Sequence, residues 1–149
     1  MANELDPRQR LEPFATLIGD WSTEATHPAT GDTLILGRVR FEWLAGERFL
    51  IQRAEAEHPA FPQSICLIGV MEGDEHLSMQ YFDSRGTHRR YGIAFDGKEL
   101  RIWRQAPGFA QRFTATVSAD GSHLEGVWQL NEADQGFRDD LKITYRRSS

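Results

Sequence analysis

The sequence contains very little cysteine and no long apolar run, and each absence excludes a class of protein. Cys66 is the only cysteine among the 149 residues, so the chain cannot form an internal disulfide. Small secreted folds that depend on disulfides are therefore excluded. No stretch approaches the roughly 20 consecutive apolar residues of a membrane-spanning helix. Residues 1–10 lack the apolar core of a signal peptide. We expect a cytoplasmic protein.

The sequence also lacks the motifs of common metal sites and enzymes. Its five histidines, at positions 27, 58, 76, 88 and 123, show no spacing typical of metal ligands. The segment from Gly31 to Gly37 is not followed by the Lys-Ser/Thr pair of a phosphate-binding loop. No Gly-x-Ser-x-Gly hydrolase motif occurs. We predict no metal site, and these motifs assign no catalytic residue.

Neither sign of charge is concentrated in one part of the chain. Seventeen basic and 22 acidic residues give a formal net charge of −5, and the two signs are interleaved. Nucleic acids and anionic membranes attract concentrated positive surfaces, so we expect neither as a partner. A chain of this length buries one hydrophobic core, and we expect a single domain over residues 1–149.

A short amphipathic helix is predicted at about residues 7–18. Asp6 and Pro7 are a typical N-cap and first helical residue, and Gly19 is a typical stop. The apolar residues at helical spacing are Leu11, Phe14, Ala15 and Ile18.

From Asp20 onward, apolar and polar residues alternate as they do in β-strands. The ten predicted strands lie at about residues 20–28, 33–44, 48–57, 64–72, 76–82, 87–96, 98–105, 110–118, 122–130 and 137–147. Tight turns, two of them Asp-Gly, alternate with longer loops. This pattern predicts an all-β, antiparallel up-and-down barrel over about residues 20–147. One end is tightly closed and carries the helix, and the other end is open.

Alternation along the strands predicts which side chains point inward. The closed end is expected to be lined by Trp21, Trp43, Phe49, Phe95, Leu100, Val117 and Tyr145. The inward polar residues all fall at the open end, and they are His27, Arg53, Tyr81, Arg89, Arg104, Gln111 and Asp139. The inward face of strand 48–57 is ambiguous, because Leu50-Gln52-Ala54 and Phe49-Ile51-Arg53 are both partly apolar.

A ring of polar groups inside a barrel is paired, hydrated or in contact with a ligand, because a buried unpaired charge is costly. The ring carries more positive than negative charge, which favours a ligand with an anionic head group and an apolar tail. Tyr91 and Trp128 complete the set of predicted ligand-binding residues. In the alternative, structural interpretation, Arg89, Arg104 and Asp139 form an ion pair that closes the mouth.

Gly19-Asp20-Trp21, which follows the helix, resembles the Gly-x-Trp signature of the calycins, a superfamily that includes lipocalins, fatty-acid-binding proteins and nitrobindins. The resemblance implies that a basic residue of the last strand, in Tyr145-Arg146-Arg147, packs over Trp21 and closes the barrel base. Gly19, Trp21 and Arg147 are then structural.

The chain also resembles a bacterial family of uncharacterised calycin-like domains, most specifically in Tyr81-Phe82-Asp83-Ser84-Arg85-Gly86. This second resemblance implies a fold and no known activity. The run is typical of a turn in which Asp83 accepts backbone amides and Gly86 takes a positive φ. By analogy with calycin-like domains, a homodimer is an open alternative.

Nitrobindins carry a haem whose iron is held by a histidine shortly before the last basic residue. Residues 139–145 contain no histidine, so the resemblance does not extend to that ligand. His27 is then the alternative axial ligand for a haem.

Three functions remain open from the sequence. The first is binding of a small, largely apolar ligand with an anionic head group, with residues 58–62 at the mouth. The second is an isomerase or cyclase that uses His27 and Asp139 with Tyr81 or Tyr91 as acid and base. The third is a barrel filled by bulky side chains, namely Trp43, Tyr91, Phe113 and Trp128.

Overall fold

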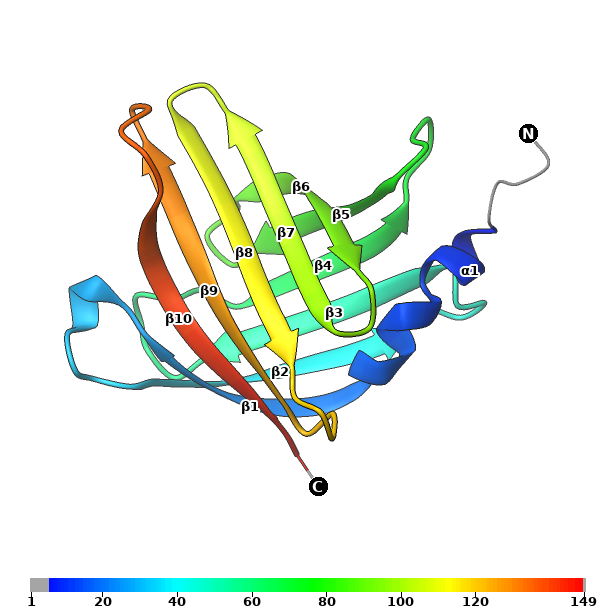
Figure 1. The fold of residues 1–149 in the computed structure, drawn as a ribbon, viewed down its shortest axis with the longest axis horizontal. Helices are drawn as coiled ribbons and strands as arrows, with labels where there is room; N and C mark the ends of the chain where they lie inside the picture. The colour runs from blue at the N-terminus through cyan, green and yellow to red at the C-terminus, as the bar shows by residue number, and fades with distance from the viewer. Residues whose placement is uncertain (1–5, 149) are drawn as a thin grey trace.

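Ten antiparallel strands form a closed barrel in the computed structural model (Figure 1). The structure describes residues 6–148. Residues 1–5, part of the stretch predicted to lack a signal peptide, and residue 149 lie outside the described residues. The strands are β1 (Gly19–Thr26), β2 (Ile35–Trp43), β3 (Phe49–Ala56), β4 (Ser64–Val70), β5 (Leu77–Asp83), β6 (His88–Phe95), β7 (Glu99–Ala106), β8 (Phe109–Val117), β9 (His123–Glu132) and β10 (Arg138–Arg147). Each strand pairs with its neighbours in sequence, and β1 pairs with β10. The predicted up-and-down barrel is confirmed.

The N-terminal helix is shorter than predicted and changes type. The α-helix α1 spans Pro7–Arg10 and a 3₁₀ helix, η1, spans Glu12–Leu17. The Asp6 side chain accepts the backbone N–H of Arg8 at 2.8 Å, as expected of an N-cap. Pro13 lacks the N–H that would continue the α-helix, so the chain tightens to three residues per turn.

The tighter spacing changes which side chains of this segment are buried. Leu11, Phe14 and Leu17, spaced by three, are at most 1% exposed, whereas Ala15, predicted on the buried face, is exposed. Phe14 contacts Phe95 with ring centroids 5.4 Å apart. The segment therefore plugs the barrel end that carries the tight turns (Figure 1). Within residues 6–148, no helix combines the length and the apolar character that a membrane crossing requires.

The predicted contact between Trp21 and the last strand is present, and Arg147 makes it. The Arg147 guanidinium lies 4.2 Å above the Trp21 ring and donates hydrogen bonds to the carbonyls of Ile18, at 2.9 Å, and Thr16. Gly19 has φ +125°, and a Cβ there would lie 3.2 Å from Nη1 of Arg147. Glycine at this position therefore permits both the backbone conformation and the close approach of the guanidinium.

The structure resolves the ambiguity of β3. Leu50, Gln52 and Ala54 point inward, and Leu50 is fully buried. Arg53 points outward, where its Nε donates to the Glu42 carboxylate at 2.8 Å. Placing Arg53 in the inward ring was wrong, as was placing Phe49 inside the barrel, because both belong to the outward phase of this strand.

A β-bulge in β10 changes the position of a second predicted residue. Asp139 pairs with Gln129 and Leu141 pairs with Trp128, so Asp140 is the extra residue between them. Asp139 lies outside the barrel, where it accepts a hydrogen bond from Nε2 of Gln129 at 2.8 Å. The inward placement of Asp139 was wrong because a bulge shifts the alternation by one residue.

Arg147→Ala should reduce the free energy of unfolding by about 2 kcal/mol, because a cation–π contact and two charge-assisted hydrogen bonds are lost. Urea-induced unfolding measures this change. Arg146→Ala is the matched control, since the Arg146 side chain makes no hydrogen bond or ion pair with residues 6–148. Equal effects of the two substitutions would show that Arg147 does not close the barrel.

Candidate functional site

The barrel encloses a cavity of about 250 Å³, lined mainly by apolar side chains. Inward positions on β1, β3 and β4 carry the small residues Ala25, Ala54 and Cys66, and these leave the space open. Burial raises the pKa of the Cys66 thiol to about 12, so the thiol stays protonated and forms part of an apolar wall. Phe61 and Pro62, from the loop after β3, also line the cavity and place that loop at its mouth.

A cluster of aromatic rings fills the barrel beside this cavity. The Tyr91 ring meets the rings of Tyr81 and Trp128 edge to face, with centroids 6.2 and 5.8 Å apart. Trp128 also packs against Phe113 at 5.0 Å. Tyr81 and Trp128 line the cavity, and Tyr91 packs against both of them. Bulky side chains thus fill part of the barrel, as one of the three interpretations predicts, and leave the cavity open.

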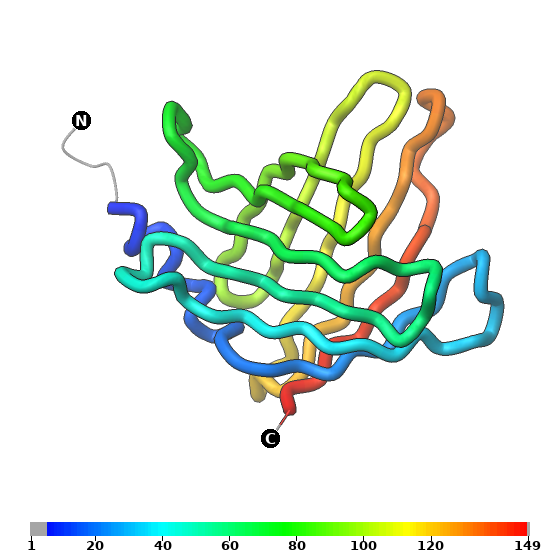
Figure 2. Tube along the Cα trace, turned by 180° about the vertical axis from the view of Figure 1, so that it is seen from behind, coloured from blue at the N-terminus to red at the C-terminus, as the bar shows by residue number. Residues whose placement is uncertain are grey.

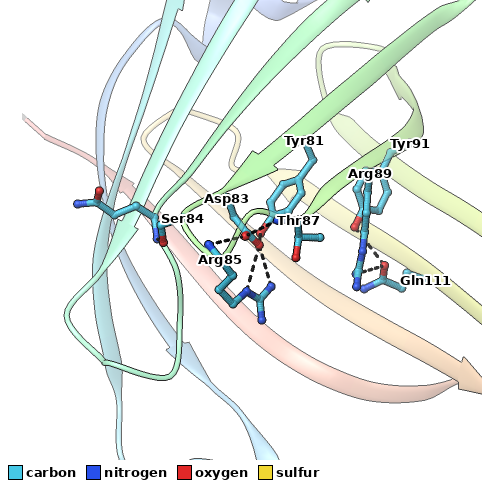
Figure 3. A network of polar contacts seen from close by, with 9 residues as sticks. Tyr81, Asp83, Ser84, Arg85, Thr87, Arg89, Tyr91 and Gln111 are labelled. Carbon is cyan, nitrogen blue, oxygen red and sulfur yellow. Dashed lines mark hydrogen bonds and ion pairs between the residues drawn. The ribbon is translucent and has the colours of Figure 1, made fainter.

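Two arginines lie next to this aromatic cluster at the open end. Gln111 Oε1 accepts hydrogen bonds from Tyr91 Oη at 3.1 Å and from Arg89 Nη1 at 3.2 Å (Figure 3). Arg104 is opposite Gln111 in the ladder and is half-buried on the inward face of β7. Burial raises the pKa of Tyr91, an effect that the Arg89 hydrogen bond and the Arg104 charge oppose. Both arginines therefore lie close enough to the Tyr91 hydroxyl to lower its pKa.

No carboxylate within residues 6–148 forms an ion pair with Arg89 or Arg104. The ion pair with Asp139 that would close the mouth is not formed, because Asp139 lies outside. The rim of β6–β8 therefore keeps two positive charges that no acid neutralises.

The barrel wall opens beside these arginines. Pairing between β6 and β7 covers only four residue pairs and ends at Gly92 and Trp103. Beyond them, the β5–β6 and β7–β8 hairpins point apart (Figure 2). Arg89 and Arg104 lie on the two separated strand ends, one on each side of this opening.

His27 follows β1 and forms part of the mouth. Its Nδ1 accepts the N–H of Ala29 at 3.0 Å, and its Nε2 lies 2.8 Å from Oδ1 of Asp140. The ring proton is therefore on Nε2 and is directed at the carboxylate. The ring also meets Phe61 edge to face at 5.7 Å, and His58 meets Phe61 from another direction at 5.4 Å. His27 thus holds the mouth loop through its ring.

The turn after β5 has the predicted form and is organised by Asp83 (Figure 3). Its side chain is 0% exposed, and its carboxylate accepts the Tyr81 hydroxyl at 2.7 Å and Nη2 of Arg85 at 2.8 Å. The backbone N–H groups of Arg85 and Thr87 also donate to it. Chiefly because of Arg85, the pKa of Asp83 lies well below its ordinary value. Burial, and then the Asp83 hydrogen bond, raise the pKa of Tyr81.

The same turn holds the mouth loop in place. Ser84 Oγ accepts the N–H of Gln63 at 3.1 Å, and the Ser84 N–H donates to the Gln63 carbonyl at 2.9 Å. The turn thus links the phenol of Tyr81, which faces the cavity, to the loop that covers it.

The structure therefore brings together six of the nine predicted ligand-binding residues: Tyr81, Arg89, Tyr91, Arg104, Gln111 and Trp128. His27 lies apart at the mouth, and Arg53 and Asp139 face outward. Asp140, the partner of His27, was not predicted from the sequence, because alternation alone does not show a bulge and its only signal was its position beside Asp139.

The four predicted acid and base residues do not form one constellation. His27 contacts Asp140, Tyr81 donates to Asp83 and Tyr91 donates to Gln111. Within residues 6–148, no three His, Cys, Asp or Glu side chains are grouped so as to hold a metal ion.

Asp83→Asn should destabilise the fold at neutral pH, because the amide nitrogen replaces an oxygen that accepts hydrogen bonds. A carboxyl whose pKa is lowered by folding stabilises the fold above its unfolded pKa and loses that effect as pH falls. The stability difference between the native sequence and the variant should therefore shrink from about pH 5 to about pH 2. Thermal unfolding at several pH values measures it.

Asp32→Asn is the control for this experiment, because the Asp32 side chain is exposed and makes no hydrogen bond or ion pair with residues 6–148. A difference for Asp83→Asn that does not change with pH would contradict the ionised, hydrogen-bonded state of Asp83.

Comparison with known proteins gives a similarity of fold to solved structures. No protein-family model matches the chain, and no curated protein matches it. The crystal structure of Rv2717c from M. tuberculosis is similar, with a TM-score of 0.65, 16% sequence identity, and coverage of 99% of this chain and 100% of that chain. At this identity the similarity shows that the two chains share a β-barrel fold, and it carries no information on the ligand.

Proposed function

We propose that the chain is a calycin-like barrel that binds a small, largely apolar ligand with an anionic head group. The observation that carries the proposal is an apolar cavity lined in part by Tyr81 and Trp128, together with two arginines at the open end, Arg89 and Arg104, that no acid neutralises. The stacking of Arg147 on Trp21 beside Gly19 favours the calycin-like assignment. The proposal includes a cytoplasmic location and no nucleic-acid or membrane partner, as the sequence composition suggests.

The size of the cavity limits the apolar part of the ligand. Pockets that hold drug-sized molecules measure roughly 300–1,000 Å³, whereas this cavity measures about 250 Å³. A short aliphatic chain suits this volume. Each methylene that leaves water contributes about 0.8 kcal/mol, so six of them supply about 5 kcal/mol before the entropy cost of binding.

The head group of the ligand is recognised at the rim of β6–β8. Arg89 donates one N–H to Gln111, and its other guanidinium N–H groups remain as donors for a ligand. Arg104 makes no hydrogen bond or ion pair with residues 6–148. Gln111 accepts the hydrogen bonds of Arg89 and Tyr91 through Oε1, so its amide N–H groups point away from these two side chains. Guanidinium and amide donors together suit a carboxylate.

The contacts favour neither haem binding nor an isomerase or cyclase. A haem needs a free axial ligand, but both ring nitrogens of His27 are engaged and the Cys66 thiol stays protonated. Turnover by an isomerase or cyclase needs an acid and a base that act on one substrate. His27 contacts the carboxylate of Asp140 and Tyr81 donates to that of Asp83, so the two side chains are engaged at different places.

Arg89→Gln and Arg104→Gln should each weaken the binding of octanoate by at least about tenfold and leave methyl octanoate unchanged. The lost charge-assisted hydrogen bonds are worth roughly 1.5–3 kcal/mol and act only on the carboxylate. Isothermal titration calorimetry measures both affinities. Arg53→Gln is the matched control, because Arg53 faces outward. Equal losses for acid and ester, or an effect of Arg53→Gln as large as the others, would contradict the proposal.

Ala54→Leu should abolish the binding of both octanoate and its methyl ester, because the added carbons occupy the cavity that Ala54 lines. Native mass spectrometry of the variant and the native sequence measures the bound fraction, and far-UV circular dichroism checks that the variant folds. The same instrument, applied to freshly purified protein before and after denaturation, identifies any ligand carried from the expression host. Unchanged binding by folded Ala54→Leu would place the ligand elsewhere.

A further inference from the structure

Three inward polar side chains of the barrel cavity have no hydrogen-bond partner in the protein. Thr23, Gln52 and Tyr145 all line the cavity, and none of their side chains makes a hydrogen bond with residues 6–148. Thr23 is 7% and Tyr145 9% exposed, and Gln52 is half-buried. We call these three side chains the inner polar cluster. Native structures satisfy nearly all buried polar groups, so this cluster requires an explanation.

The inner polar cluster faces the open space of the cavity. Ser78 Oγ, which is not part of the cavity wall, is the one side-chain oxygen or nitrogen within residues 6–148 that is both sealed and without a partner. The polar atoms of the cluster can therefore be reached from the cavity. Water can hydrate them in the free protein. A purely hydrocarbon tail displaces that water and leaves them unpaired, which opposes its binding.

The members of the cluster approach the cavity from two walls. Thr23 and Tyr145 are directly opposite each other in the ladder of β1 with β10, and Gln52 is opposite Cys66 in the ladder of β3 with β4. Burial, and after it the nearby Cys66 thiol, raise the pKa of Tyr145. The phenol therefore stays protonated and extends towards the wall that carries Cys66 and Gln52.

The inner polar cluster is neutral. Among the residues of 6–148 that line the cavity, Glu55 alone is charged, and its carboxylate is paired with Arg38 on the outside of the barrel. A second carboxylate or an ammonium group of a ligand would have no partner of opposite charge here. A hydroxyl group both donates and accepts hydrogen bonds, as the amide and hydroxyl groups of the cluster do. The cluster therefore suits a hydroxyl group.

The cluster lies away from the rim arginines, at a separation that a chain can bridge. Gln52, Cys66, Tyr81 and Arg89 are opposite one another in successive ladders from β3 to β6. Gln52 and Arg89 thus belong to one row of inward residues and are three strands apart, or about 14 Å along the wall. Both side chains extend into the barrel, so the space between their polar groups suits a chain of medium length.

We propose that the ligand of the cavity is a carboxylic acid of medium length with a hydroxyl group at the end remote from its carboxylate. The carboxylate lies at Arg89 and Arg104, and the hydroxyl exchanges hydrogen bonds with Gln52 and Tyr145. This inference rests on the proposed function and adds the part of the site that determines specificity.

The acids octanoate and 8-hydroxyoctanoate differ only by this hydroxyl, so their affinities test the inference. Isothermal titration calorimetry of the native sequence should give 8-hydroxyoctanoate a Kd at least about fivefold below that of octanoate. Gln52→Met and Tyr145→Phe nearly keep the size of the side chain and break no hydrogen bond within residues 6–148. Each should reduce this preference at least about threefold, because the hydroxyl of the ligand loses a partner.

Gln105→Met is the matched control, because Gln105 is exposed on the outer face of β7, and it should keep the native preference. Far-UV circular dichroism checks that each variant folds.

The outcomes separate this inference from the proposed function. Suppose that octanoate binds and that Arg89→Gln weakens it. If 8-hydroxyoctanoate then binds no more tightly, or if Gln52→Met and Tyr145→Phe both keep the native preference, the inner polar cluster holds water only. This inference is then wrong and the proposed function stands. If neither acid binds, or if Arg89→Gln changes the affinity of neither, the proposed function fails and this inference fails with it.

Discussion

Closure of the barrel between β1 and β10 is the constraint on which the rest of the molecule depends. The ladder runs from Trp21 opposite Arg147 to Thr26 opposite Lys142, and the Arg147 guanidinium ties it to the N-terminal segment. Closure leaves no unpaired edge at this seam. It also determines, for every strand, which alternate residues face the interior. The cavity and the rim arginines are consequences of that geometry.

The closed end of the barrel interior stabilises the fold, and the open end is the candidate binding site. Around the closed end, the apolar side chains of Leu11, Phe14 and Leu17 complete the core. Towards the open end, the same alternation continues into Arg89 and Arg104, which no acid neutralises. A purely structural barrel would pair these charges or replace them, because unpaired charge opposes folding. The retained charge is what makes this end the candidate site.

The sequence predicted the strands and turns well, because period-two alternation and Asp-Gly turns are local signals. It failed where the signal was not local. In β3 both faces are partly apolar, so the phase depended on which face met the core, and Arg53 was misplaced. In β10 the bulge before Leu141 reversed the phase, so Asp139 was misplaced and Asp140 was overlooked. Pro13 was visible in the sequence, yet the change from α to 3₁₀ helix was not predicted.

The end of the β6–β7 ladder explains why the rim arginines are accessible from the side of the barrel. Trp103 and Arg104 are consecutive in β7, and they face outward and towards the inner rim respectively. Gly92 is the residue of β6 at which its pairing with β7 ends. A continuous ladder here would hold the strands at hydrogen-bonding distance and close the wall between Arg89 and Arg104. Because pairing stops at Gly92 and Trp103 instead, one local separation of strands gives access to the arginines from the side.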